Sequence, residues 1–314
     1  MGAGALNDRF WAAAAAAATG VQVGSAMVAT RFVVDQTGPA SLALLRYAIG
    51  ACCLIPVVLL TRSRVRIAPR DIAPIALLGI TQFGILIALL NYGLRSVPAG
   101  RAALIFATLP LLTSLVAAAL GRERLTPSKL AGVLLTIAGV GLALGDKTLQ
   151  PGGADAAWLG ELAVFASALT GAVCSVLYRP YLEKYPTLPV SAFAMLASVA
   201  FLALLAAREG FFASRPALTS GGWLAVVFIG LASGGGYYLW LWALNHGTPT
   251  QVTMFLALSP VTATMLGAWL LGEPVSRMLA VGLAAVVAGL ALAHRRLEPR
   301  SRALALDSER GRAL

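Results

Sequence analysis

The stretch LSPVTATMLGAWLLGEP, Leu258 to Pro274, decides the fold class of this chain, because a faint earlier copy lies 150 residues before it. The earlier copy is LPLLTSLVAAALGRERL, Leu109 to Leu125. The pairs that match at this offset are Pro110 with Pro260, Ala118 with Ala268, Leu120 with Leu270, Glu123 with Glu273, Gly132 with Gly282 and Gly139 with Gly289. The similarity extends upstream across most of each half, so the sequence predicts two repeats.

The composition predicts that both repeats lie in a membrane. Of the 314 residues 59% are hydrophobic and only 12% are charged, against about 25% charged in an ordinary soluble domain. From Pro216 to Gly272 there are 57 residues without an Asp, Glu, Lys or Arg, and the mean hydropathy of the chain is +0.82. The net charge of +11 comes from basic residues between and beyond the apolar runs, which is typical of orientation signals rather than of a nucleic-acid site. The three cysteines support neither a disulfide framework nor a metal site.

Apolar runs of about 17 to 25 residues, each long enough to cross roughly 30 Å of hydrocarbon, predict ten transmembrane helices. The first run, FWAAAAAAATGVQVGSAMVA, is longer than the core of a signal peptide, so we expect it to be retained. The run without charges is expected to divide at Asn245-His246-Gly247-Thr248-Pro249, with a re-entrant loop as the alternative. The expected spans are 10–30, 39–60, 72–94, 97–120, 127–145, 156–178, 187–207, 220–242, 248–271 and 277–294.

These spans predict an all-α membrane protein of ten transmembrane helices in two inverted five-helix repeats. We expect a cytoplasmic N-terminus over 1–9, a first repeat over 10–145, a second repeat over 156–294 and a disordered cytoplasmic tail over 295–314. With the N-terminus inside, the cytoplasmic segments carry 16 Lys and Arg residues against 6 on the opposite side, which places both termini in the cytoplasm. Because five is odd, the second repeat is expected to enter the membrane upside down.

An inverted repeat indicates a mechanism as well as a fold. Two halves related by a pseudo-twofold axis in the membrane plane can exchange conformations, so that a central site opens first to one side and then to the other. Pro110 and Pro260 fit such movement as hinges, because a kink frees a carbonyl that neighbours or cavity water can satisfy. The alternative is that both prolines only shape helix packing.

A family resemblance rests on the same residues. Pro110, Gly121-Arg122-Glu123-Arg124-Leu125, Gly132 and Gly139 recur as Pro260, Gly272-Glu273-Pro274, Gly282 and Gly289, and LLRYAIGA surrounds Arg46. Over residues 10 to 294 this pattern resembles the EamA repeat of the drug/metabolite transporter superfamily. The resemblance implies helices 1 to 4 and 6 to 9 around a central cavity, helices 5 and 10 at the periphery, and export of a metabolite. Leu196 stands where the second repeat would match Arg46, so the role of Arg46 is not expected to be symmetric.

Charged residues inside the spans are the first candidates for a site, because charges are costly in lipid and usually face a cavity or a partner. Arg46, Arg101 and Glu161 qualify, and in this topology all three lie in the outer third of the membrane. We expect them to act as a proton or charge relay, with snorkelling to the interface as the alternative. Glu123 and Glu273 lie at helix ends and are expected to brace the structure rather than to touch substrate.

Uncharged polar and aromatic residues in the spans are expected to line the cavity. Tyr238 and Trp242 are preferred, because residues four apart share one face of a helix. The full set of predicted substrate-binding residues is Gln22, Arg46, Asn91, Tyr92, Thr170, Tyr238, Trp242 and Gln251.

These features predict a secondary transporter of a small polar or amphipathic metabolite such as an amino acid, and the family resemblance implies that it is an exporter. An enzyme is not expected, because the spans contain no HExxH and no intramembrane aspartate pair, and no P-loop is present to hydrolyse ATP. A non-transporting scaffold or sensor and a channel-like facilitator are the alternatives. We expect no cofactor and no metal, and as partners a small-molecule substrate, the lipid bilayer and protons as coupling ion. The protein is expected in the bacterial inner membrane as a monomer or homodimer.

Overall fold

The structure, a computed structural model, describes residues 3–60, 67–122, 126–145, 154–213, 216–246, 255 and 258–294. All regular secondary structure in these ranges is helical. In chain order the helices are α1 (Ala3–Val33), α2 (Pro39–Leu60), α3 (Pro69–Gly79), α4 (Leu86–Gly93), α5 (Ala99–Phe106), α6 (Leu109–Ala119), α7 (Pro127–Gly145), α8 (Ala154–Lys184), α9 (Thr187–Arg208), α10 (Ser220–His246), α12 (Leu258–Leu271) and α13 (Arg277–His294). A short 3-10 segment, η1 (Val34–Gln36), follows α1, and a π-helical segment, η2 (Ile80–Ile85), joins α3 to α4.

Seven helical segments among the described residues are long and apolar enough to cross a membrane, and Leu258–Leu271 and Arg277–Leu292 are shorter apolar helices. The seven are Ala14–Gln36, Pro39–Leu60, Pro69–Gly93, Ala99–Ala119, Pro127–Gly145, Trp158–Lys184 and Thr187–Arg208. Four helices, α2, α7, α9 and α13, begin and end within one residue of their expected spans. The first part of the expected span over 248–271 lies outside the described residues, apart from residue 255.

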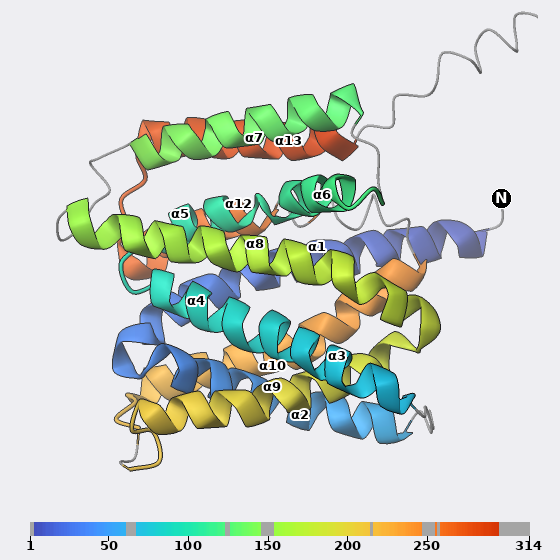
Figure 1. The fold of residues 1–314 in the computed structure, drawn as a ribbon. Coiled ribbons are helices and arrows are strands. Elements are labelled where there is room, and N and C mark those ends of the chain that lie inside the picture. Colours follow the sequence, from blue (N-terminus) through green and yellow to red (C-terminus); the bar gives the residue numbers. More distant parts are fainter. Residues whose placement is uncertain are drawn as a thin grey trace, which may run out of the picture.

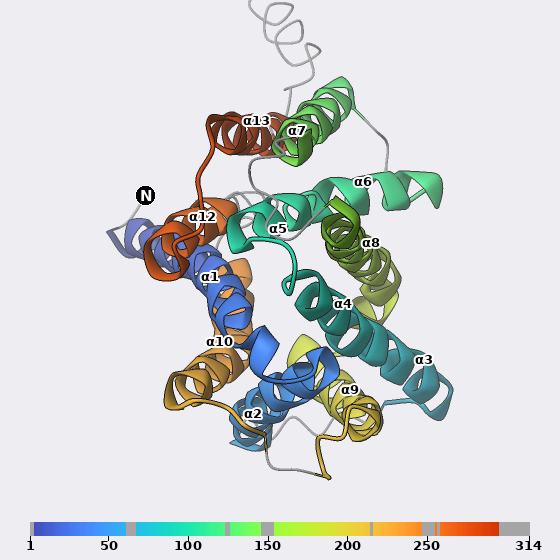
Figure 2. The same ribbon diagram turned by 90° about the vertical axis from the view of Figure 1, so that its left-hand side faces the viewer.

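The helices form a ring when the molecule is viewed end-on (Figure 2). Around it α1 packs on α10, α10 on α2, α2 on α9, α9 on α3, α4 on α8, α8 on α6, and α5 on α12, which returns to α1. The pair formed by α7 and α13 lies outside this ring (Figures 1 and 2). The ring therefore brings residues from widely separated parts of the sequence around one centre.

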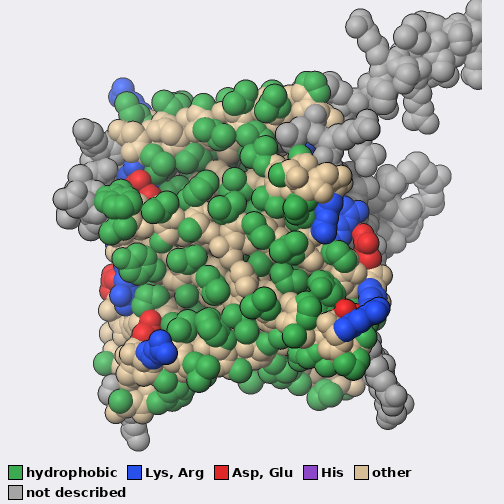
Figure 3. Space-filling view, in the orientation of Figure 1, with side chains coloured by type: hydrophobic (Ala, Val, Ile, Leu, Met, Phe, Trp, Pro, Cys, Tyr) green, Lys and Arg blue, Asp and Glu red, His purple; other side chains and the backbone are tan. Residues whose placement is uncertain are grey.

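The outer surface has the polarity that a membrane requires. In Figure 3 apolar side chains cover the middle of the visible face, and Lys, Arg, Asp and Glu side chains gather near its left and right edges. Large apolar side chains such as Leu134 and Ile137 of α7 and Trp269 of α12 are exposed, the last at 79%. Such exposure is costly in water and favourable in hydrocarbon.

Helices α7 and α13 approach closely through glycines of the repeated signature. A Cβ atom added at Gly139 would lie 2.7 Å from the carbonyl oxygen of Gly282, and one added at Gly289 would lie 2.8 Å from that of Gly132. Small residues at such crossings let helix backbones touch in a membrane, where packing drives helix association. The matched glycines of the two copies therefore serve a single interface between them.

The same signature ends α6 and α12 with a glycine in the left-handed conformation. Gly121 has φ 69° and Gly272 has φ 65°, which glycine adopts at no steric cost. After α6, the N–H of Gly121 donates to the carbonyl of Ala118 and the N–H of Arg122 donates to that of Ala117, as in a Schellman motif. The glycine before the signature's glutamate is therefore a helix stop.

Candidate functional site

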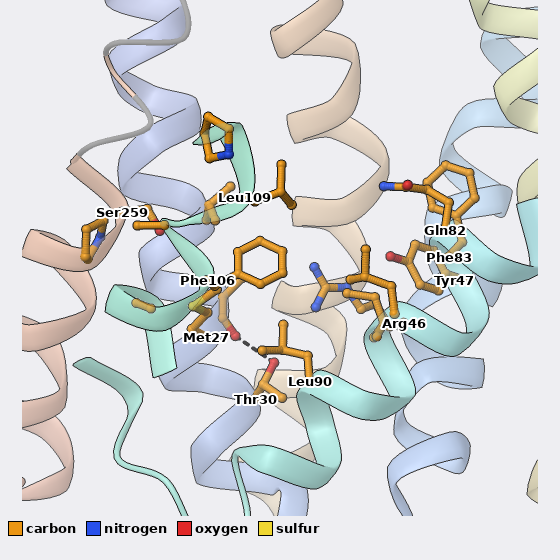
Figure 4. A pocket seen from close by; sticks show the side chains of 18 of the residues that line it. Met27, Thr30, Arg46, Tyr47, Gln82, Phe83, Leu90, Phe106, Leu109 and Ser259 are labelled. Carbon is orange, nitrogen blue, oxygen red and sulfur yellow. Dashed lines mark hydrogen bonds between the residues drawn. The ribbon is translucent and has the colours of Figure 1, made fainter. Parts of the chain in front are cut away.

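A cavity of about 300 Å³ lies inside the ring of helices. Its wall is formed by α1, α2, η2, α4, the junction of α5 and α6, the start of α12 and one residue of α13 (Figure 4). The described lining residues are Val23, Ala26, Met27, Thr30, Arg46, Tyr47, Gln82, Phe83, Leu86, Ile87, Leu90, Ala103, Phe106, Ala107, Leu109, Pro110, Ser259, Pro260 and Leu290. Most are apolar, and Arg46 is the one charged residue among them.

Arg46 is held in place by a residue of the opposite half of the chain. Its Nε donates a hydrogen bond to Ser233 Oγ over 2.6 Å, and the Ser233 hydroxyl in turn donates to the carbonyl of Ile229 in α10. The guanidinium carbon lies 5.7 Å from the ring centre of Tyr47. In Figure 4 the two terminal nitrogens point away from α2 into the cavity, toward Phe106 and Leu90. The guanidinium is thus anchored at one nitrogen and presents the others to the cavity.

An aromatic group stands beside Arg46. Tyr47 and Phe83 make an edge-to-face contact with ring centres 5.3 Å apart, and Phe83 makes a second one with Tyr237 at 6.5 Å. The Tyr237 hydroxyl is 2.7 Å from Ser191 Oγ. Aromatic pairs in this geometry stabilise one another beyond the area they bury. The group therefore packs tightly behind Tyr47 and Phe83 in the cavity wall.

Gln82 reaches the same wall because the helix is locally wide. It lies with Phe83 in the π-helical η2, a form of helix that occurs often at functional sites. Its side-chain Oε1 is buried and has no hydrogen-bond partner among the described residues. Gln82 therefore adds a neutral polar group to the cavity near Arg46.

Both prolines of the repeated signature lie in the cavity wall. The expected continuous span over 97–120 is divided into α5 and α6, with Ala107 and Thr108 between them. Pro110 has no N–H to offer the carbonyl of Phe106, four residues before it, so the α-helical hydrogen bond is missing there. The Thr108 hydroxyl stabilises the break by donating to the carbonyl of Ile105 over 2.7 Å.

Arg101 and Glu161 form an ion pair away from the cavity lining. Arg101 Nη2 lies 2.9 Å from Glu161 Oε1, and the same nitrogen donates to the carbonyl of Leu144 over 2.6 Å. The Arg101 side chain is only 1% exposed and that of Glu161 17%. The pair joins α5 to α8 and to the end of α7.

Glu273 and Glu209 each place a carboxylate at the N-terminus of a helix in the other half of the chain. Both Glu273 oxygens lie 2.9 Å from the N–H of Ala99 at the start of α5, and Arg31 Nε is 3.8 Å away. Glu209 accepts from the N–H groups of Ala40 and Ser41 at the start of α2. A carboxylate satisfies the free N–H groups of a first turn and interacts favourably with the helix dipole.

Replacing Glu209 by Ala is expected to destabilise the protein by about 1.5–3 kcal/mol, because charged hydrogen bonds to the first turn of α2 are lost. Glu209→Gln retains an acceptor and should lose less. The measurement is unfolding of the purified protein in detergent. Asp35→Ala is the control, since its carboxylate pairs with the side chain of Arg31 rather than with the N–H groups of a helix start. Equal stability of the Glu209 and Asp35 variants would contradict the capping role.

The sequence matches a known family twice. The EamA-like transporter family covers residues 10–145 and 158–295, which together make up most of the chain. The chain belongs to the EamA-like transporter family. It is therefore an integral membrane protein of a transporter family, with the lipid bilayer and a small-molecule substrate as its partners.

Relatives of this EamA-like protein include proteins described as exporters. It is 33% identical over 284 residues to a probable terminal-alkyne amino-acid exporter of Streptantibioticus cattleyicolor, covering 88% of this chain and 91% of the relative. It is 31% identical over 201 residues to an aromatic amino acid exporter of Ancylobacter novellus, covering 64% of this chain and 68% of the relative. A solved crystal structure is 28% identical with a TM-score of 0.63, covering 91% of this chain and 99% of that one.

Of the substrate-binding residues that the sequence predicted, Arg46 is the one that the described cavity lining contains. Gln22 donates to the carbonyl of Ala232 over 3.0 Å and so ties α1 to α10, and buried Asn91 donates to the carbonyl of Pro39 over 2.9 Å. Thr170 donates to the carbonyl of Ala166 in its own helix, and Tyr92 is 48% exposed. Tyr238 and Trp242 lie in α10, but their side chains, like all of Gln251 and Glu123, lie outside the described residues.

The three charged candidates do not form one cluster in this EamA-like protein. The ion partner of Glu161 is Arg101, whereas Arg46 bonds to Ser233. Sequence reasoning missed Tyr47, Gln82, Phe83, Phe106 and Ser259, all of which line the cavity. Gln82 had a usable signal, since it is a polar residue in the apolar run ITQFGI. Nothing in the sequence marked the π-helical turn that carries it.

Proposed function

We propose that this protein is a secondary transporter that exports a small polar or amphipathic metabolite, such as an amino acid, by alternating access. The observation that carries the proposal is the cavity inside the ring, which has one charged residue and a broken helix in its wall. Transporter sites are typically formed at membrane depth by discontinuous helices of two repeats. The two exporters among the relatives support outward transport of an amino acid.

The proposed architecture is ten transmembrane helices in two inverted repeats, the first over 10–145 and the second over 156–294; the tail expected over 295–314 lies outside the described residues. Two successive matches to the family support the two units. The break before Pro110 and the position of Pro260 in the same cavity wall support paired hinges. In the proposed alternating-access cycle these two prolines are the points at which one half moves against the other.

We further propose that both termini face the cytoplasm in a bacterial inner membrane. The start of α1 and the end of α13 lie toward the same edge of the molecule (Figure 1). The 16 to 6 distribution of Lys and Arg supports the assignment of that edge to the cytoplasmic side. The described lining residues all belong to one chain, so the proposal holds for a monomer, and a homodimer would carry two such sites.

The test is counterflow in liposomes. Purified protein is reconstituted, loaded with one unlabelled amino acid at a time, and assayed for uptake of the same labelled compound with and without a pH gradient. Saturable counterflow of one class of compound is the expected result, because a carrier exchanges substrate across a site that opens to one side at a time. Uptake that does not saturate would favour a channel-like facilitator, and absence of uptake across the panel by folded protein would favour a non-transporting role.

Proton coupling through Glu161 is part of this proposal. Glu161 is a carboxylate within a membrane-spanning helix, with its side chain 17% exposed and in contact with Arg101. Intramembrane carboxylates often serve as proton relays. Glu161→Gln, shown to be folded and inserted, should transport at a rate that no longer depends on the pH gradient. Full pH-dependent transport by this variant would remove Glu161 from the coupling mechanism and leave the carrier proposal intact.

A further inference from the structure

The charge inside the cavity identifies the part of a substrate that the protein recognises. We infer that the cavity selects a monoanion, a carboxylate carried on a compact apolar or aromatic body, and that a substrate's ammonium group is dispensable. This inference rests on the proposed function, because it takes the cavity to be the transport site. It assigns the carboxylate to Arg46 and the apolar body to the wall around Phe83 and Phe106.

Arg46 lacks a counter-charge in the described structure. Its one hydrogen bond among the described residues goes to a neutral serine, and its neighbour in space is the ring of Tyr47. A guanidinium cannot release its proton at any ordinary pH, so an apolar cavity that contains it favours an anionic occupant. Its planar array of donors matches the two oxygens of a carboxylate.

Among the described residues, no acid lies in the cavity lining where it could neutralise Arg46 or receive an ammonium group. No described lining residue is Asp or Glu. Three acids in or near the membrane spans bind other groups: Glu161 pairs with Arg101, Glu209 caps the start of α2, and Glu273 caps the start of α5. The segment from Pro216 to Gly272 contains no acid, so its side chains cannot supply one wherever they lie.

Neutral acceptors are present, and they explain why an ammonium is tolerated rather than required. The Gln82 side-chain oxygen has no partner among the described residues, and the carbonyl of Phe106 is freed by Pro110. Both can accept a hydrogen bond from an amino group. Neither supplies a negative charge, so removing the amino group costs the ligand less than removing the carboxylate.

The experiment compares four probes of similar size on the purified protein in detergent: 3-phenylpropanoate, L-phenylalanine, 3-phenylpropanamide and 2-phenylethylamine. Binding is measured by titration of intrinsic fluorescence and by the shift in thermal unfolding, neither of which requires transport. The two carboxylates are expected to bind. The amide and the amine are expected to bind at least about 10-fold more weakly, because a charged hydrogen-bond pair is lost.

Variants test whether Arg46 causes the expected order of affinities among the four probes. Arg46→Gln is expected to lower the affinity for 3-phenylpropanoate about 10-fold or more, while Arg46→Lys retains part of it. Arg208→Gln is the matched control, because it removes one positive charge from an exposed residue outside the cavity lining. Should Arg46→Gln fail to fold, Ser233→Ala removes the anchor of Arg46 and is expected to weaken carboxylate binding selectively.

Three results would overturn the inference: amide or amine binding as tight as the acid, unchanged acid affinity in folded Arg46→Gln, or no binding of either carboxylate to folded wild-type protein. Counterflow separates these from a failure of the proposed function. A protein that exchanges an amine or a neutral metabolite would remain a transporter with a different selectivity. Carboxylate binding without any counterflow would support the recognition site and count against transport.

Discussion

Replacing Glu161 by Leu is expected to destabilise the protein by about 3–5 kcal/mol, because it leaves a buried arginine without its partner. Arg101 is 1% exposed, and its terminal nitrogen lies 2.9 Å from the Glu161 carboxylate. An arginine cannot discharge itself by releasing a proton. The remaining bond to the carbonyl of Leu144 gives Arg101 a polar contact without a compensating charge.

The reverse substitution should cost less. Arg101→Met leaves Glu161 without its cation, but a carboxylate can bind a proton and remain in the apolar environment as a neutral acid. The double variant Arg101→Met with Glu161→Leu is expected to lie near the wild type, since replacing both partners of a buried pair by apolar residues is often neutral. The order of stability should therefore be wild type and double variant, then Arg101→Met, then Glu161→Leu.

Reversible unfolding in mixed micelles measures this order, and a second ion pair provides the control. Arg179 and Glu183 in α8 are also 2.9 Å apart, but their side chains are 71% and 66% exposed. Glu183→Leu should change the stability by only about 0.3–0.5 kcal/mol, as expected for an exposed pair one helical turn apart. Comparable losses from the two pairs would show that burial of Arg101 does not determine the effect.

The sequence predicted the bounds of several helices closely because hydrocarbon excludes charge. The spans expected over 39–60 and 127–145 coincide with α2 and α7, which end where polar or helix-breaking residues begin. The repeat also led to Pro110 and Pro260, and both lie in the cavity wall. A proline in an apolar run is visible in the sequence and has a direct effect on the backbone.

The cavity itself was poorly predicted, because composition does not give the rotation of a helix about its axis. Tyr92 is exposed while the adjacent Asn91 is fully buried, yet both are polar or aromatic residues in the same apolar run. The side-chain amides of Gln22 and Asn91 donate hydrogen bonds to carbonyls of neighbouring helices. The partner of Arg46 is 187 residues away in the sequence, and no local pattern marks such a contact.

Glycine spacing also fails to show which way a helix faces. Gly20 and Gly24 of α1, and Gly230 and Gly234 of α10, are each four residues apart, a spacing that lets helices approach closely. The helices do pack together, but the glycines of α1 face the segment around Phe255 and Ser259, and those of α10 face α2. The spacing alone therefore does not identify the helix that each glycine contacts, and Gly141 and Gly145 of α7, also four apart, have no neighbour within reach of an added Cβ atom.

Gly24→Val is expected to reduce counterflow about tenfold or more and to destabilise the protein by about 1–3 kcal/mol, because it overpacks the contact between α1 and α12. A Cβ atom at this position would collide with the carbonyl of Ser259 and would lie 2.8 Å from Thr262 Cβ. Backbone cannot rotate away as a side chain can, so α1 and α12 must separate. Ser259 and Pro260 line the cavity, and their displacement changes its wall.

Gly141→Val is the matched control, since a Cβ atom at Gly141 would meet nothing within 4 Å. The two variants make the same chemical change in a membrane helix and differ in what the new side chain touches. Gly24→Ala should lie between the wild type and Gly24→Val, because the collision begins at Cβ and grows with branching. If Gly24→Val and Gly141→Val transport equally well, the approach of α1 to α12 does not shape the site. If only Gly24→Val loses transport while remaining folded, this contact between the two halves of the chain sets the geometry in which Arg46 meets its ligand.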